Sequence, residues 1–140
     1  MPDKLHKGRC LCGKVSIEAR GEPYRVGVCH CLTCRQMHSA PFSVFAVFPT
    51  DAVRIEGEVL AFASSEKATR HACPACGSPV HAHYGRPDEI YVYPGSFDAP
   101  VSWQPTYELW TIRREAWLPP FPGIVNRYDK DRPRWSRTEP

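Results

Sequence analysis

The stretch CLCGKVSIEAR, residues 10–20, contains the two features that decide the fold of this chain. Its first part is a pair of cysteines, Cys10 and Cys12, followed by glycine. Its second part, from Lys14 to Arg20, alternates polar and apolar side chains, which is typical of a strand with one buried face. The stretch therefore predicts a β domain whose first strand is tied down by cysteine ligands.

Short runs of the same kind recur along the chain and predict a mainly β protein of antiparallel sheets joined by tight turns. Fifteen prolines in 140 residues disfavour long helices, because each proline removes a donor and clashes with the preceding turn. One short helix is expected at residues 33–39. Further strands are expected at residues 24–29, 42–48, 53–58, 60–63, 67–72, 80–84, 89–93 and 107–111.

The length of 140 residues, without a repeat or a Gly/Ser linker, predicts one domain. We expect a zinc-binding domain at residues 1–118 and a solvated Pro- and Arg-rich tail at residues 119–140. No run is apolar enough to span a membrane, and no apolar segment follows the charged first eight residues. We therefore expect a cytoplasmic protein with no membrane partner. A net charge of +3, without long runs of like charge in the body, does not favour nucleic acid as a partner.

The seven cysteines fall into three groups, and an odd number in a reducing compartment favours metal ligands over disulfides. A glycine follows the first and third groups, where it permits a turn that aims backbone amides at the sulfurs, whereas Arg35 follows the central group. This difference separates a four-cysteine group from a cysteine trio. The four-cysteine group is Cys10, Cys12, Cys73 and Cys76, and the trio is Cys29, Cys31 and Cys34.

The four-cysteine group predicts a closed tetrahedral metal site, because a two-residue turn brings the second thiolate of a C-x-x-C pair back toward the first. Such a site would link residue 10 to residue 76 and add folding free energy to a small β domain. A reactive dithiol is the alternative. A redox C-x-x-C would normally open a helix, and Pro74 with Gly77 fits a metal-binding turn better.

The trio predicts a different kind of site. Cys29 and Cys31 project to one face at a strand end, so His30 points away, and Cys34 returns after a short turn. Three protein ligands leave one metal position open, and a thiolate-rich ion suits a soft external thiolate. We therefore expect a site that binds a substrate thiol and holds it as the nucleophile. The alternative is a second closed site completed by one of the histidines His38, His71, His81 and His83.

Residues near the trio have two interpretations each. Arg35 could pair with a substrate carboxylate in bidentate fashion, or it is a solvated arginine on a helix surface. Tyr107 and Trp110 could line an apolar wall of the site, or they belong to the core.

At these residues the sequence resembles the glutathione-dependent formaldehyde-activating enzyme family, also called S-(hydroxymethyl)glutathione synthase-like, which includes centromere protein V. The resemblance spans residues 8 to about 118. It rests on GRCLCGKV (8–15), CHCLTCR (29–35), APFSVF (40–45), CPACGSP (73–79) and PGSFD (94–98).

The resemblance implies a β-tent zinc fold, with a structural zinc on the four-cysteine group and a substrate-side zinc, or another divalent metal, on the trio. It implies a carbon-sulfur lyase or synthase acting on S-hydroxymethylglutathione, the adduct of glutathione and formaldehyde, with the trio at its catalytic centre. Family members carry a Ser-Gly pair where this chain has His38 and Ser39. His38 would narrow that space or add a donor, so we expect it to contact substrate together with Arg35. The alternative function is a non-catalytic module that binds thiols or peptides, because no general base stands near the trio.

Overall fold

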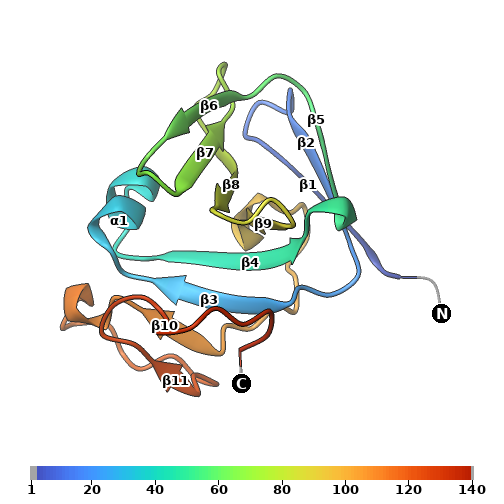
Figure 1. Ribbon diagram of the computed structural model, residues 1–140. Helices are drawn as coiled ribbons and strands as arrows, with labels where there is room; N and C mark the ends of the chain where they lie inside the picture. Colours follow the sequence, from blue (N-terminus) through green and yellow to red (C-terminus); the bar gives the residue numbers. More distant parts are fainter. Residues whose placement is uncertain (1–2, 140) are drawn as a thin grey trace.

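The computed structural model describes residues 3–139, so Met1 and Pro2 of the predicted domain and Pro140 of the predicted tail lie outside it. The described chain folds into two β-sheets that lean together like the sides of a tent (Figure 1). The smaller sheet is antiparallel, with the strand order β1-β2-β5. Its strands are β1 (Leu5–Arg9), β2 (Ser16–Arg20) and β5 (Val53–Glu56).

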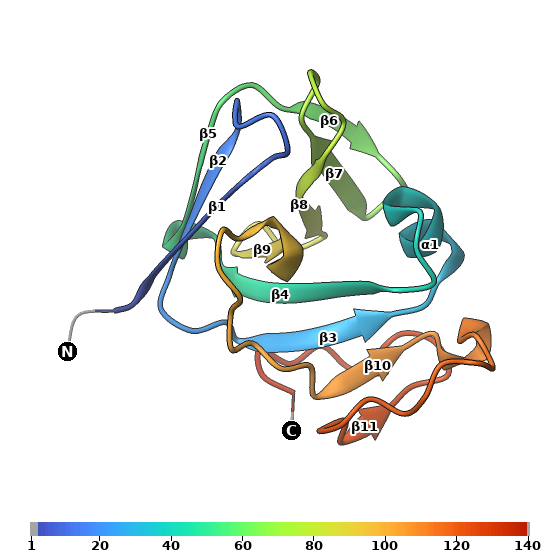
Figure 2. The ribbon, with the colours of Figure 1, turned by 180° about the vertical axis from the view of Figure 1, so that it is seen from behind.

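The larger sheet has the order β11-β10-β3-β4-β9-β8-β7-β6 and curves from the base of the tent up its second side (Figure 2). Its strands are β3 (Arg25–Cys29), β4 (Ser43–Pro49), β6 (Leu60–Ala63), β7 (Ala68–Ala72), β8 (Pro79–Tyr84), β9 (Glu89–Val92), β10 (Tyr107–Leu109) and β11 (Asn126–Arg127). Short 3-10 helices occur at Thr50–Ala52, Pro94–Ser96 and Thr111–Arg113. The prediction of a mainly β protein is confirmed.

Every strand expected from the alternating runs is present, but two further strands were not predicted. In β1 the buried positions are His6 and Gly8, whereas Leu5 is exposed, so the strand carries no apolar alternation. His6 packs edge-on against Trp103 at 4.7 Å, and β11 is only two residues long. The expectation of purely antiparallel sheets is wrong at the base, because β10 pairs in parallel with both β3 and β11.

Strand β4 is buried on both faces and divides the interior into two clusters. Ala46 and Phe48 face the cluster between the two sheets, which also contains residues of β2, β8 and β9. Phe45 and Val47 face the opposite cluster, beside the trio. On β3, Gly27 makes room for this second cluster: a Cβ there would lie 2.7 Å from the Phe45 ring.

The only α-helix among residues 3–139 is α1 (Leu32–His38), which connects β3 to β4. It begins after Cys31, whose sulfur accepts a hydrogen bond from the Cys34 backbone N–H at 3.3 Å. It ends at Ser39, which has a left-handed conformation with φ of 48°. No helix in the described chain is both long and apolar enough to cross a membrane.

Most residues from 119 to 139 are exposed and none is buried, but several of them contact the body of the domain. Residues 126–127 form β11, and later residues return across the larger sheet (Figure 1). The backbone carbonyl of Arg137 accepts a hydrogen bond from Arg25 at 3.0 Å, and the Trp135 indole N–H donates to Glu89 at 3.2 Å. The Pro- and Arg-rich end of the chain is thus exposed to solvent and also attached to the body, through Arg25 and Glu89. A domain boundary at residue 118 stays a prediction.

Candidate functional site

The four-cysteine group lies at the top of the tent, where the two sheets meet. Cys10 and Cys12 occupy the turn after β1, and Cys73 and Cys76 occupy the turn after β7. The four sulfur atoms lie within 4.8 Å of one another. The sulfur-to-sulfur distance is 3.6 Å from Cys10 to Cys12 and 3.8 Å from Cys12 to Cys73. Tetrahedral bonds of about 2.3 Å place sulfurs about 3.8 Å apart, so the group could hold a metal ion.

The backbone around these cysteines has the predicted turns. Gly13 and Gly77 have φ of 81° and 78°, which confirms the left-handed conformation expected after each second cysteine. The Val15 N–H lies 3.3 Å from the Cys10 sulfur. The Ser78 hydroxyl, 3.2 Å from the Cys76 sulfur, lowers the pKa of Cys76 to about 5. The Ser78 hydroxyl therefore favours the thiolate of Cys76, the form that binds metal.

The trio lies where β3 ends and α1 begins. Cys29 is the last residue of β3, Cys31 caps α1 and Cys34 is in its first turn. Their sulfurs also lie within 4.8 Å of one another, and Cys29 and Cys34 are buried. The thiols of Cys29 and Cys34 stabilise the Cys31 thiolate, which lowers the pKa of Cys31 and raises that of Cys29. The surroundings favour the thiolate form of only one of the three cysteines. A bound cation is therefore needed if all three are to be thiolates.

No histidine in residues 3–139 completes the trio. His38 packs edge-on against Tyr93 at 4.6 Å, and His71 stacks on His81 at 4.0 Å. His30 points away from the sulfurs, as strand alternation predicts, and its Nε2 lies 2.9 Å from a carboxylate oxygen of buried Glu108. The residues described here therefore offer three ligand atoms at the trio.

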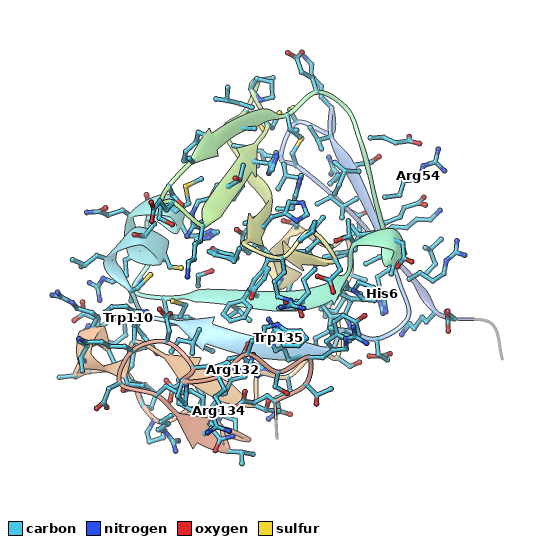
Figure 3. All side chains as sticks on the ribbon, viewed as in Figure 1. His6, Arg54, Trp110, Arg132, Arg134 and Trp135 are labelled. Atoms are coloured by element: carbon cyan, nitrogen blue, oxygen red, sulfur yellow. The ribbon has the colours of Figure 1, made fainter. Side chains whose placement is uncertain are left out.

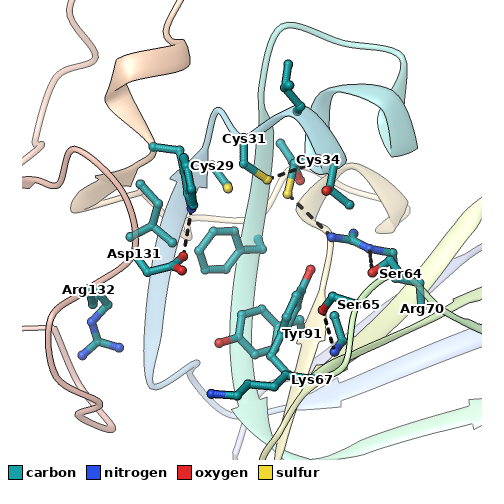
Figure 4. A pocket seen from close by; sticks show the side chains of 18 of the residues that line it. Cys29, Cys31, Cys34, Ser64, Ser65, Lys67, Arg70, Tyr91, Asp131 and Arg132 are labelled. Atoms are coloured by element: carbon teal, nitrogen blue, oxygen red, sulfur yellow. Dashed lines mark hydrogen bonds between the residues drawn. The ribbon is translucent and has the colours of Figure 1, made fainter.

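A cavity of about 970 Å³ opens beside the trio (Figure 4). One end of it contains the three cysteines, and aromatic side chains of β8, β9 and the loop after β10 form part of its wall. Its charged lining is mainly positive. The cations are Arg25, Lys67, Arg70, Arg113, Arg132 and Arg134, and the anions are Glu66 and Asp131.

Arg70 is a cavity cation in contact with the trio. Its Nη2 lies 3.9 Å from the Cys34 sulfur, and its Nε donates to the Ser64 hydroxyl at 2.9 Å. The residue is 3% exposed, and its buried Nη1 has no hydrogen-bond partner among residues 3–139. We did not predict Arg70 from the sequence, although one signal was present: it lies between Ala68 and Ala72 on the buried face of β7.

Neither residue expected to contact substrate lines the cavity. Arg35 pairs with Glu115 and donates to the Arg113 carbonyl at 3.1 Å. Burial lowers the pKa of His38 to about 4, so this side chain is neutral at pH 7. The substrate-binding roles of Arg35 and His38 stay predictions.

The two aromatic residues near the trio lie in different places. Trp110 lines the cavity and donates from its indole N–H to Asp131 at 2.9 Å. Tyr107 is 1% exposed and belongs to the core cluster below the trio.

Comparison with known proteins adds three matches. A model of the glutathione-dependent formaldehyde-activating enzyme family matches residues 5–113. An uncharacterized lyase of Schizosaccharomyces pombe is 34% identical over 84 residues, which cover 60% of this chain and 60% of that relative. A crystal structure of a Rhodobacter sphaeroides protein has a similar fold, with a TM-score of 0.57 at 22% identity, covering 69% of this chain and 91% of the other.

Proposed function

Because the chain belongs to the glutathione-dependent formaldehyde-activating enzyme family, we propose that it is a zinc-dependent carbon-sulfur lyase or synthase acting on S-hydroxymethylglutathione. One observation carries the proposal: three gathered sulfurs open into a cavity whose charged lining is mainly positive. The sulfurs suit a metal with one free position, and the cations suit a thiol that carries carboxylates. Glutathione and formaldehyde are the proposed substrates.

The two cysteine groups have different proposed roles. The four-cysteine group would hold a structural zinc, because four thiolates at these distances fill a tetrahedral ion. Cys29, Cys31 and Cys34 would hold the substrate-side zinc, or another divalent ion, and form the catalytic centre. When bound there, the ion supplies a site that lowers the pKa of a substrate thiol and keeps its sulfur in place.

Arg70 favours entry of a fourth sulfur as a thiolate. Three thiolates and one divalent ion carry a net charge of −1, and an external thiolate makes it −2. The Arg70 guanidinium, buried and 3.9 Å from the Cys34 sulfur, offsets one of these charges.

In the reaction, the substrate sulfur donates an electron pair to the carbon of formaldehyde. A carbon-sulfur bond forms, the carbonyl π electrons move to oxygen, and that oxygen takes a proton from water. Since the thiol proton leaves when the thiolate binds, thiol and aldehyde combine without loss of atoms. The reverse steps release formaldehyde. Holding the two reactants together in the cavity supplies most of the acceleration.

A non-catalytic thiol- or peptide-binding module is the second candidate. It is favoured by the absence of histidine from the cavity lining within residues 3–139. Of the two lining carboxylates, Asp131 is already bound by Trp110. Such a module would bind glutathione without accelerating its reaction with formaldehyde.

The first experiment measures metal content and turnover on the same sample. We expect two zinc ions per chain and an exchange between ¹³C-formaldehyde and S-hydroxymethylglutathione, followed by NMR, that is faster than in buffer. Calorimetric binding of glutathione without faster exchange would favour the module. A single bound zinc, with the trio freely alkylated, would contradict both the second zinc site and the proposed reaction.

The second experiment concerns Arg70. We expect Arg70→Met to raise the KM for glutathione roughly tenfold to a hundredfold, because a hydrogen bond to a charged group contributes about 1.5–3 kcal/mol. Arg70→Lys should restore part of the loss, since it keeps the charge but not the planar fork. The control is Arg54→Ala, an exposed arginine on the other sheet (Figure 3). Equal KM values for all four proteins would remove Arg70 from the site.

A further inference from the structure

The C-terminal strap, which we define as residues 128–139, forms one wall of the cavity. The family match ends at residue 113, yet the lining includes Asp131, Arg132, Arg134 and Trp135. Residues 114–139 therefore lie outside the part of the chain shared with the family model. The strap gives this cavity a wall that the family model does not describe.

The strap is attached near the trio at its first end. The Tyr128 N–H donates to the Glu108 carbonyl at 2.9 Å, and the Trp110 N–H donates to the Lys130 carbonyl at 3.1 Å. Asp131 accepts from the Trp110 indole at 2.9 Å, as Figure 4 shows beside Cys29. This end of the strap thus lies next to β10, whose Leu109 pairs with Cys29.

The strap is attached again at the far end of the cavity. The Trp135 indole donates to buried Glu89 at 3.2 Å, and the Arg86 guanidinium lies 3.5 Å from the centre of the Trp135 ring. In the sheet, Cys29 pairs with Ser43 of β4 and Glu89 pairs with Pro49, six residues farther along that strand. Six residues of strand span roughly 20 Å, so the strap runs along the length of the cavity.

Four cavity cations have no ion pair in the described chain: Lys67, Arg70, Arg113 and Arg134. Arg70 lies at the trio end, 3.9 Å from the Cys34 sulfur, and so does Arg113, whose carbonyl accepts from Arg35, the residue after Cys34. The far end of the cavity is left with Lys67 and Arg134. Arg25 is paired with Glu89 at 2.8 Å, and Arg132 is paired with Glu139 at 2.8 Å. Lys67, from the turn between β6 and β7, and Arg134, from the strap, have no carboxylate partner among residues 3–139. Figure 4 shows Lys67 at the side of the cavity opposite the three cysteines.

We propose that the strap completes a carboxylate subsite, with Arg134 and Lys67 as its cations, that selects thiols carrying a carboxylate remote from the sulfur. The inference rests on the proposed function, in which the sulfur occupies the trio end of the cavity. A thiolate at one end and a carboxylate at the other place the substrate lengthwise under the strap. A small thiol without a carboxylate binds only through its sulfur at the trio and makes no contact with the subsite. The subsite therefore discriminates between thiols by their charge.

The experiment uses the metal-loaded full chain and two measurements. The first is calorimetric binding of S-methylglutathione, which keeps both carboxylates but has no free thiol. The second is the ratio of kcat/KM for glutathione to that for cysteamine, which has a thiol and no carboxylate. In the double variant Lys67→Ala with Arg134→Ala, we expect S-methylglutathione affinity and the ratio each to fall roughly tenfold to a hundredfold.

The matched control is Arg137→Ala. Arg137 lies on the same strap, but its guanidinium lies 4.9 Å from the Tyr24 ring centre, and the residue does not line the cavity. We expect the Arg137→Ala protein to bind S-methylglutathione with the affinity of the unsubstituted protein. A Trp135→Phe variant keeps an aromatic ring but loses the N–H that donates to Glu89. We expect it to lower the ratio of kcat/KM for glutathione to that for cysteamine, as the double variant does.

The outcomes separate the two proposals. Unchanged S-methylglutathione binding in the double variant, or no binding by the unsubstituted protein, overturns the subsite whether or not the protein turns over glutathione. Weakened binding in the double variant, in a protein that does not accelerate the thiol-formaldehyde reaction, supports the subsite and removes the proposed reaction.

Discussion

Cys73→Ser is expected to unfold the domain. Cys73 is 2% exposed and belongs both to the four-cysteine group and to the cluster between the sheets. A structural zinc contributes about 10–16 kcal/mol of apparent binding free energy in small zinc domains. A whole domain is stable by only about 5–15 kcal/mol, so impaired metal binding here removes most of that stability.

The measurement is circular dichroism with metal analysis. We expect loss of the native β spectrum or a large drop in melting temperature, together with loss of the structural metal. Leu11→Ala is the control, because Leu11 lies in the same turn and is 81% exposed. A Cys73→Ser protein that melts like the control and retains both metals would show that the four-cysteine group does not support the fold.

Cys31→Ser is expected to abolish thiol chemistry while keeping the fold. Serine is a preferred helix N-cap, so its hydroxyl can replace the Cys31 sulfur as acceptor for the Cys34 N–H. The serine hydroxyl is, however, a poorer metal ligand than the cysteine thiolate. Changing residues that only support a ligand costs tenfold to a hundredfold in metal affinity or activity, and we expect a loss of at least roughly a hundredfold in kcat/KM here.

The readouts for Cys31→Ser are metal content, melting temperature and turnover. We expect the metal content to fall from two ions to one, with a melting temperature within a few degrees of the unsubstituted protein. If Cys31→Ser unfolds the domain while Cys73→Ser only inactivates it, the structural and catalytic roles belong to the opposite groups.

The local part of the fold could be predicted from the sequence because each strand carries its own alternation. The expected strand at residues 60–63 has the observed bounds, and the expected helix at 33–39 begins one residue late and includes its cap, Ser39. β1 could not be found this way, since its buried residues depend on distant loops: the His6 ring packs on Trp103, and the Gly8 backbone forms a β-bridge with Phe97.

The cysteine groups could likewise be predicted, because turn geometry within a few residues brings each pair of sulfurs together. The cavity could not. Its lining comes from β3, from the turn between β6 and β7, and from the strap, which are brought together only by sheet order. Arg134 looks like an ordinary surface arginine until its neighbours are known, and Arg70 differs only in its place between Ala68 and Ala72 on one face of a strand. Arg35 was predicted because it adjoins the trio in sequence, yet its guanidinium contacts Glu115.

The two-sided burial of β4 has a consequence for redesign. Ala46 and Phe48 pack toward one cluster and Phe45 and Val47 toward the other, so a change of size in this strand disturbs the supports of both cysteine groups. The strap residues Arg134 and Trp135 belong to neither cluster. An attempt to adapt the cavity to a different thiol should therefore randomise Arg134 and Trp135 and leave β4 fixed, since these two strap residues line the cavity without belonging to a core cluster.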